Sequence, residues 1–179
     1  MKRSISDIEN EIINQILVAE TCFLICKSSP TPAGRGDDFL PFFYNLTFSK
    51  GVMSLHNLLL SKKRNEITIA NYIAQKDLEF MRGSGLVINK KIIDLTKQMN
   101  LVFPISLRNK VIAHNDSNFA HADFVRAYLA DKTTLNEYMA ITEDLKEVFC
   151  EVSNYDKTVS YDKILFQAKQ VVETILKSN

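Results

Sequence analysis

The chain has 179 residues, of which 46% are hydrophobic and 24% charged, proportions typical of one globular domain. It carries 22 basic and 21 acidic residues, so its net charge is +1. This balance argues against the broad basic surface of a general nucleic-acid-binding domain, and any contact with RNA would have to be local. We expect one helical domain over residues 1–179.

The sequence also bears on the cellular compartment. No run of 18 or more apolar residues occurs, which argues against a transmembrane helix. Residues 1–10 turn polar and acidic where a signal peptide would need an apolar run. The three cysteines, an odd number, do not indicate a set of disulfides. We therefore expect a cytoplasmic protein that makes no membrane contact.

The first predicted helix covers roughly residues 5–27. Ser6 and Glu9 have the spacing of a capping box, in which hydroxyl and carboxylate each satisfy a free amide at the helix start. Apolar residues recur at spacings of three and four and predict one buried face: Ile5, Ile8, Ile12, Ile16, Ala19, Phe23 and Cys26. Residues 28–36 contain two prolines and two glycines and predict a loop.

Asp37 or Asp38 can cap a second helix, with Pro41 in its first turn, where a missing amide hydrogen costs little. This helix should end near the polar run 61–65. Its predicted apolar side consists of Phe39, Phe43, Leu46, Met53 and Leu60, with Phe42 and Leu59 beside them.

A shorter helix is predicted over residues 69–80. The next helix should be capped by Asn89 or a nearby residue, and Pro104 either kinks it or starts a new helix. Helix continues to His114, where the turn-forming residues 115–118 end it. The apolar stripe of this region is Ile88, Ile92, Leu95, Met99 and Val102.

The C-terminal third also predicts helices, although residues 119–132 are ambiguous. Thr134 and Glu137 have capping-box spacing before a stripe of Leu135, Tyr138, Thr142, Leu145, Phe149 and Val152. A last helix, roughly residues 160–177, carries Tyr161, Leu165, Ala168, Val172 and Ile175. Without strand alternation or repeats, the natural result is an all-α bundle of five to seven helices.

One segment is not explained by packing alone. On a helix, Arg108 lies in phase with Ile105 and Val111, where an arginine is seldom buried without a partner. His114 follows six residues later, about 240° around the axis, so the two side chains do not meet within one ideal helix. They could converge if the helix bulges near Ala113, or if the stripe is a two-fold dimer interface.

Such a pair supports a recognisable chemistry. A histidine, with a free pKa of about 6.5, can accept and return a proton near neutral pH. An arginine is permanently cationic and binds phosphate oxygens in a forked geometry. Together they suit cleavage of RNA by the ribose 2′-hydroxyl, without a metal, with the arginine stabilising charge on the pentavalent phosphate.

At these residues the sequence resembles a known family. The segment 107–116, Leu-Arg-Asn-Lys-Val-Ile-Ala-His-Asn-Asp, is similar to the signature of the HEPN superfamily, an arginine, a polar residue and then a histidine after four to six positions. The fuller form, with Ala113 before the histidine and Asp116 after it, resembles the AbiU-type abortive-infection branch. The aromatic and leucine-rich second helix also looks like that branch.

The resemblance implies a helical bundle that dimerises and places two copies of the motif in a shared cleft. It implies a metal-independent ribonuclease without a cofactor, acting as a toxin or phage-defence effector, with RNA as substrate and an antitoxin protein as partner. Arg108 would bind phosphate, His114 would be the acid or base, and Asn109 would orient one of them. Lys110 and Asp116 would contribute to RNA binding.

One departure from the family concerns Asp116. Some toxins of the superfamily have a tyrosine there, which a partner nucleotidyltransferase modifies, so that form of neutralisation is not expected. Other members bind partners without cleaving anything. The alternative is therefore a non-catalytic helical dimer that binds a protein partner or a nucleotide, in which Arg108 and His114 cap carbonyls or pair with Asp116.

The remaining candidate residues have simpler interpretations. His56 lies on the apolar side of the second helix and is expected to be a satisfied core or interface histidine. Cys22 and Cys26 are one turn apart, but no nearby residues complete a four-ligand metal site, so we expect buried small hydrophobes. Residues 62–64, Lys-Lys-Arg, gain meaning only if the fold brings them beside the motif.

Overall fold

The computed structural model describes residues 4–28, 39–61, 67–80, 84–102 and 132–158, and the single positions 161, 166, 170, 173 and 174. These residues form five helices and no strand. The expected all-α bundle is thereby confirmed. No helix in these ranges combines the length and apolar character needed to span a bilayer.

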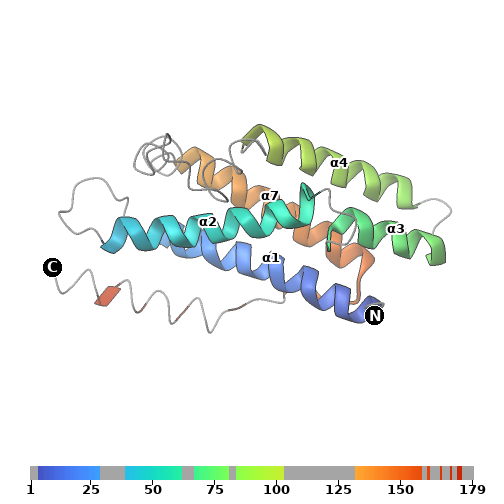
Figure 1. The fold of residues 1–179 in the computed structure, drawn as a ribbon, viewed down its shortest axis with the longest axis horizontal. Helices are drawn as coiled ribbons and strands as arrows, with labels where there is room; N and C mark the ends of the chain where they lie inside the picture. The colour runs from blue at the N-terminus through green and yellow to red at the C-terminus, as the bar shows by residue number, and fades with distance from the viewer. Residues whose placement is uncertain are drawn as a thin grey trace.

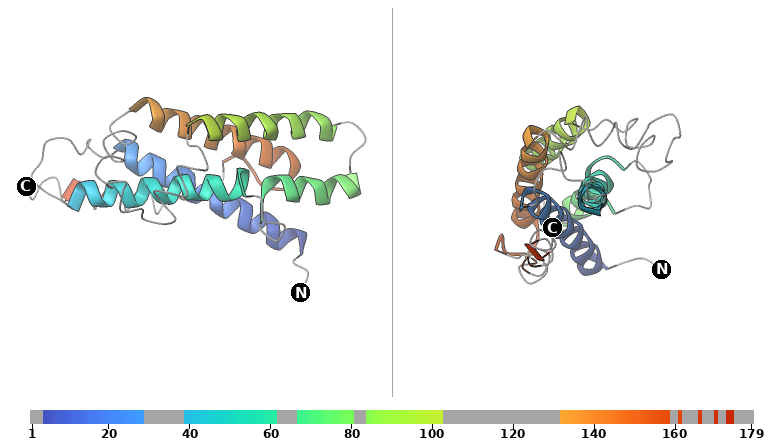
Figure 2. Two further views of the ribbon diagram at one scale, coloured as in Figure 1. Left: turned by 45° about the horizontal axis from the view of Figure 1, so that its top comes forward. Right: turned by 90° about the vertical axis from the view of Figure 1, so that its left-hand side faces the viewer.

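The helices form an up-and-down arrangement (Figures 1 and 2). Their bounds are α1 Ile5–Ser28, α2 Phe39–Leu59, α3 Ile69–Phe80, α4 Ser84–Val102 and α7 Lys132–Val152. Helices α2 and α3 lie end to end, and together with α7 they run antiparallel to α1 and α4. Helix α1 packs along both α2 and α7, and α4 covers the other side of α7.

The cap of α1 differs from the expected one. The Ser4 hydroxyl accepts a hydrogen bond from the Asp7 amide (3.1 Å), and the Asp7 carboxylate accepts one from the Ser4 amide (3.2 Å). This reciprocal pair satisfies two amides that a helix start leaves free. The capping box predicted at Ser6 and Glu9 is therefore wrong, because Ser6 already lies within the first turn and Glu9 is buried against other helices.

Two further helix starts also differ from expectation. Helix α4 begins at Ser84, so Asn89 lies inside it and does not cap it. Helix α7 begins at Lys132, which places Thr134 in its first turn. Helix α3 has the predicted bounds, and the Thr68 hydroxyl caps it by accepting a hydrogen bond from the Asn71 amide (3.1 Å).

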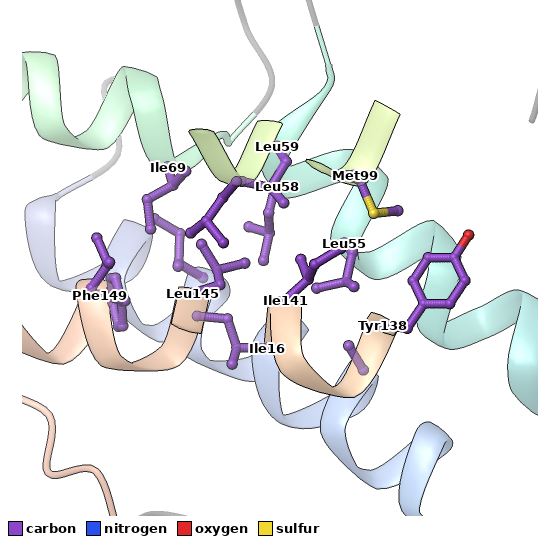
Figure 3. Close-up of a cluster of buried hydrophobic side chains, with 14 of the residues drawn as sticks. Ile16, Leu55, Leu58, Leu59, Ile69, Met99, Tyr138, Ile141, Leu145 and Phe149 are labelled. Carbon is purple, nitrogen blue, oxygen red and sulfur yellow. The ribbon is translucent and has the colours of Figure 1, made fainter. Parts of the chain in front are cut away.

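The predicted stripes of α1, α4 and α7 form the core (Figure 3). All their members are buried except Ile5, Val102 and Val152, which are partly buried and pack against the core. Thr142 is tolerated there because its hydroxyl donates to the Tyr138 carbonyl one turn earlier (2.7 Å). Spacing at threes and fours thus predicted the buried face of three helices.

The predicted buried side of α2 is wrong at four of its described residues and right at Leu59, which is buried. Leu46 is 61% exposed, and Phe43, Met53 and Leu60 are only partly buried. Helix α2 is apolar on nearly all sides, so its sequence does not single out one face. The residues that it buries are Tyr44, Phe48, Val52, Leu55, Leu58 and Leu59.

Helices α1 and α2 approach closely at Gly51. A Cβ atom there would lie 2.8 and 2.9 Å from two ring atoms of Phe23, and 3.1 Å from Cβ of Cys22. The Phe23 ring cannot move aside easily, since it stacks on Tyr138 (centroids 5.4 Å apart) and meets Phe48 edge-on (5.8 Å). Glycine is required at this position for space.

The expected last helix falls mostly outside the described residues. Within it, Phe166, Gln170, Glu173 and Thr174 have helical backbone. The Thr174 hydroxyl donates to the Gln170 carbonyl one turn earlier (2.8 Å). These positions agree with a helix in the predicted range.

Substituting Gly51→Ala tests the close approach of α1 and α2. In an open helix this change stabilises by about 1 kcal/mol. Here the methyl group would overlap the Phe23 ring, and overpacking of this kind costs about 1–3 kcal/mol. We expect a lower free energy of unfolding in urea denaturation, whereas Asn57→Ala, at an exposed site of α2, should leave it nearly unchanged. Equal or higher stability of Gly51→Ala would contradict this packing.

Candidate functional site

The segment predicted to carry the chemistry, residues 103–131, lies outside the described residues, and with it Arg108, Asn109, Lys110, His114 and Asp116. Its two anchoring points are described. Helix α4 ends at Val102, and its antiparallel neighbour α7 begins at Lys132. The chain thus leaves and re-enters the bundle at one end, where α1 also ends and α2 begins (Figure 1). We call this the motif end.

Aromatic side chains pack the bundle toward the motif end. Tyr138, in the second turn of α7, stacks on Phe23 and meets Phe48 edge-on at 5.4 Å. Tyr44 stacks on Phe48 with centroids 6.4 Å apart. Figure 3 shows the Tyr138 hydroxyl pointing away from the apolar cluster. This packing holds the first turns of α7 firmly against α1 and α2.

A cleft of about 530 Å³ lies between α1 and α7. Lys146 lines it, and its ammonium donates to both carboxylate oxygens of Glu20, at 3.0 and 3.1 Å. The Lys146 side chain is only 10% exposed and that of Glu20 29%. A lysine so deeply buried requires such a partner, because an unpaired charge there would be strongly destabilising.

The rim of this cleft carries further charges. Lys157 pairs with Glu147, and its hydrogen bond lowers the pKa of that carboxyl. Glu143 adds a third carboxylate, while Phe23 and Met139 contribute apolar lining. Both lysines that line the cleft face carboxylates, so this arrangement suits charge pairing more than proton transfer.

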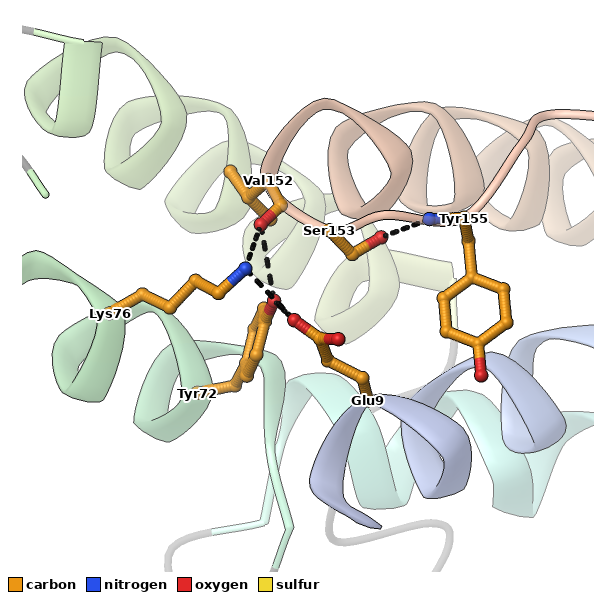
Figure 4. A network of polar contacts seen from close by, with 6 residues as sticks. All are labelled: Glu9, Tyr72, Lys76, Val152, Ser153 and Tyr155. Atoms are coloured by element: carbon orange, nitrogen blue, oxygen red, sulfur yellow. Dashed lines mark hydrogen bonds and ion pairs between the residues drawn. The ribbon is translucent and has the colours of Figure 1, made fainter. Parts of the chain in front are cut away.

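The strongest polar cluster lies at the opposite end of the bundle (Figure 4). We call it the Glu9 cluster, formed by the side chains of Glu9, Tyr72 and Lys76 and the carbonyl of Val152. The Lys76 ammonium lies 2.8 Å from Glu9 Oε1 and donates to the Val152 carbonyl at 2.7 Å. The Tyr72 hydroxyl is 2.5 Å from Glu9 Oε1 and 3.1 Å from the Val152 oxygen.

The Glu9 cluster joins α1, α3 and α7. Val152 is the last residue of α7, so its carbonyl has no partner within the helix. The negative end of the helix dipole also stabilises the positive charge of Lys76. Burial, reinforced by the hydrogen bond to Glu9 and by its charge, raises the pKa of Tyr72 above its usual range. A tyrosine held protonated in this way donates a hydrogen bond. Because the contacts of the Glu9 cluster join three helices, its role is structural.

Sequence spacing gave no signal for these polar residues. Tyr72 is 63 positions from Glu9, and Lys146 is 126 positions from Glu20. A local pattern shows at most that a charged residue is expected on an apolar face, as the spacing predicts for Arg108. It does not identify the distant residue that pairs with it.

The other candidate residues lie in the core or at its margin. His56 is 2% exposed, which confirms the expected core histidine. Cys26 is buried and its thiol lies 3.8 Å from the Tyr44 carbonyl oxygen, while Cys22 is half-buried. Burial raises the pKa of Cys22 to about 11. Within the described ranges, no three His, Cys, Asp or Glu side chains gather as a metal site would require.

The chain matches no protein-family model, no curated protein and no solved structure. The resemblance to the HEPN superfamily therefore rests on the residues of the motif themselves.

Removing the Lys76 ammonium tests whether the Glu9 cluster stabilises the bundle. In Lys76→Met the buried Glu9 carboxylate loses its cation and the Val152 carbonyl loses a donor. Breaking a buried ion pair in this way costs about 3–5 kcal/mol, and the partial exposure of Lys76 (21%) places the expected loss near the lower limit. Urea denaturation measures the change.

Lys91→Met is the matched control, since Lys91 of α4 pairs with Glu151 of α7 and both side chains are exposed, at 44% and 38%. Such surface pairs contribute about 0–1 kcal/mol. If both variants lose equally little stability, the Glu9 cluster does not hold the three helices together.

Proposed function

We propose that this protein is a metal-independent endoribonuclease of the HEPN type, acting as a homodimer in phage defence or as a toxin. The observation that carries the proposal is Arg108, in phase with an apolar stripe, six residues before His114 in a segment that resembles the HEPN signature. The proposed substrate is single-stranded RNA, whose 2′-hydroxyl supplies the nucleophile.

In the proposed step, His114 of one subunit accepts the proton of the ribose 2′-hydroxyl. The 2′-oxygen forms a bond to phosphorus, the bond from phosphorus to the 5′-oxygen breaks, and His114 of the second subunit returns a proton to that leaving oxygen. The products are a 2′,3′-cyclic phosphate and a 5′-hydroxyl end. Arg108 stabilises the added charge on the phosphate, and Asn109 orients one of the two side chains. Lys110 and Asp116 contribute to RNA binding.

Several features of the described helices support this proposal. The motif segment joins α4 to α7 at one end of an antiparallel bundle. The starts of α2 and α7 lie at that end, and the partial positive charge of helix N-termini favours a phosphate group. The aromatic packing around Tyr138 gives the first turns of α7 a rigid base, as a positioned catalytic group requires.

Dimer formation is supported by the outer side of α4. Val87, Ile93 and Leu101 are 60%, 53% and 81% exposed. At 100° per residue they fall within about 120° of one another, on the side opposite the buried stripe, and the exposed Lys90, Asp94 and Lys97 share this arc. Leu101 lies one residue before the end of α4. A second copy seated on this surface would bring the two motif segments close together.

Cleavage of RNA in the presence of EDTA tests the catalytic proposal. Wild-type protein should cleave, while His114→Ala and Arg108→Ala should each lose at least about 100-fold in rate, as expected for loss of general acid–base catalysis or of phosphate stabilisation. The rate should show a bell-shaped pH profile, since one histidine must be neutral and the other protonated.

His121→Ala is the matched control, because it removes the other histidine near the motif and should retain activity. Absence of cleavage by the wild-type protein, or equal cleavage by the wild type and both motif variants, would refute the proposed ribonuclease activity.

The second candidate is a non-catalytic helical dimer that binds a protein partner or a nucleotide. The exposed apolar residues of α4 favour it as much as they favour a dimeric enzyme. It predicts dimers without RNA cleavage, and it predicts that the motif variants lose stability or dimerisation.

Light scattering of α4 variants tests the dimer itself. Ile93→Asp and Leu101→Asp should shift a dimeric protein to monomers, because each places a charge in an apolar contact, at a cost of about 2–3 kcal/mol or more in association. Phe166→Asp, at an exposed apolar residue outside α4, should not. A dimer unaffected by both α4 variants must form through another surface.

A further inference from the structure

A second hollow, of about 400 Å³, lies between α1 and α2. Val18, Cys22 and Ile25 of α1 line one side, and Phe43 and Leu46 of α2 line the other. Leu46 is 61% exposed in this groove, although it is a large apolar side chain. We call this the α1–α2 groove. Its lining is almost wholly apolar and therefore fits an apolar occupant.

The chain that follows α7 runs back along α1 toward this groove. The Tyr155 hydroxyl hydrogen-bonds Asn10, and Tyr155 also packs on Phe149 with centroids 6.0 Å apart. Six residues later, the Tyr161 hydroxyl bonds Asn14, and Tyr161 itself lines the groove. The chain has thus advanced one turn along α1, in the direction from Asn14 to Ile25.

The residues beyond Tyr161 have two distinct faces. At 100° per residue from Phe166, seven apolar residues lie within about 140° of one another: Ile164, Leu165, Ala168, Val171, Val172, Ile175 and Leu176. The described positions Phe166, Gln170, Glu173 and Thr174 have helical backbone and lie within about 100° of one another, on the opposite face. All four are exposed.

We propose that the α1–α2 groove binds the C-terminal segment of the same chain, residues 162–176, as an amphipathic helix parallel to α1. Tyr161 is already seated at the start of the groove, so no linker has to be ordered for this segment to enter. The exposed side of the segment is the side that the described positions occupy. Its apolar side is directed to Val18, Cys22, Ile25 and Leu46.

The lengths also agree. From Asn14 to Ile25, α1 rises about 16 Å, and a helix over residues 162–172 would rise by about the same amount. If Tyr161 lies beside Asn14, Ala168 lies beside Thr21 and Cys22, and Val172 lies beside Ile25. The small side chain of Ala168 then lies beside Cys22 of α1, which lines the groove.

Disulfide trapping in the full chain tests the proposal, with Cys22 as the native partner. Ala168→Cys and, as the matched control, Gln170→Cys on the exposed face are compared in a Cys150→Ser background. Because burial raises the pKa of Cys22 to about 11, oxidation is catalysed with copper phenanthroline at mildly alkaline pH. We expect Ala168→Cys to link to Cys22 within one chain about tenfold faster than Gln170→Cys, as peptide mapping would show.

Equal rates for the two variants would overturn the proposal. So would a link from Ala168→Cys that forms only between chains, since the occupant would then be the segment of a second copy.

Thiol labelling provides a second measurement, which does not depend on disulfide geometry. Leu165→Asp/Val172→Asp should release the segment and raise the labelling rate of Cys22 about tenfold. The labelling rate of Cys26, which is 2% exposed in the core, should not change, and this shows that the bundle remains folded. An unchanged rate at Cys22, or an equal increase at Cys26, would contradict the docking.

Discussion

The contact of the Phe23 ring with the bare backbone of Gly51 determines how the three central helices lie. One side of the ring fills the space that a Cβ atom would need, and the ring also stacks on Tyr138 of α7. The Phe23 side chain thus limits how closely α1 and α2 approach and also contacts α7. Because protein interiors are close-packed, a shift of this ring would move the start of α7, where the motif segment re-enters the bundle.

The two ends of the bundle differ in their polar contacts. At one end the Glu9 cluster joins α1, α3 and α7 through short charged hydrogen bonds, which have directional requirements. Aromatic rings pack at both ends: Phe149 contacts Tyr72 and Tyr155 beside the Glu9 cluster, and Phe48 contacts Tyr44 and Tyr138 toward the motif end. The end with directional bonds fixes the register of the helices.

The sequence predicted the parts of this fold that depend on local spacing. Residues at threes and fours marked the buried faces of α1, α4 and α7, because the apolar residues at that spacing fall within one arc of each helix. The same method failed for α2, which is apolar nearly all round, so tertiary packing chose its buried face. It also assigned Glu9 to a local cap, since its true partners, Tyr72 and Lys76, are more than 60 positions away. The motif at Arg108 and His114 is a prediction from residue type and spacing, and whether the two side chains converge depends on geometry that spacing does not supply.

That geometry connects the proposed chemistry to the proposed dimer. Six residues of ideal helix separate Arg108 and His114 by about 240°, so one undistorted helix cannot direct both side chains at the same phosphate. A two-fold axis removes the difficulty, because it brings the arginine of one copy to the histidine of the other. The exposed Leu101 lies seven residues before Arg108, at the end of α4 from which the motif segment departs. A dimer formed on the outer side of α4 would therefore place its axis close to both motifs, whereas a dimer formed elsewhere would require a bulge near Ala113 to bring the two side chains together within one chain.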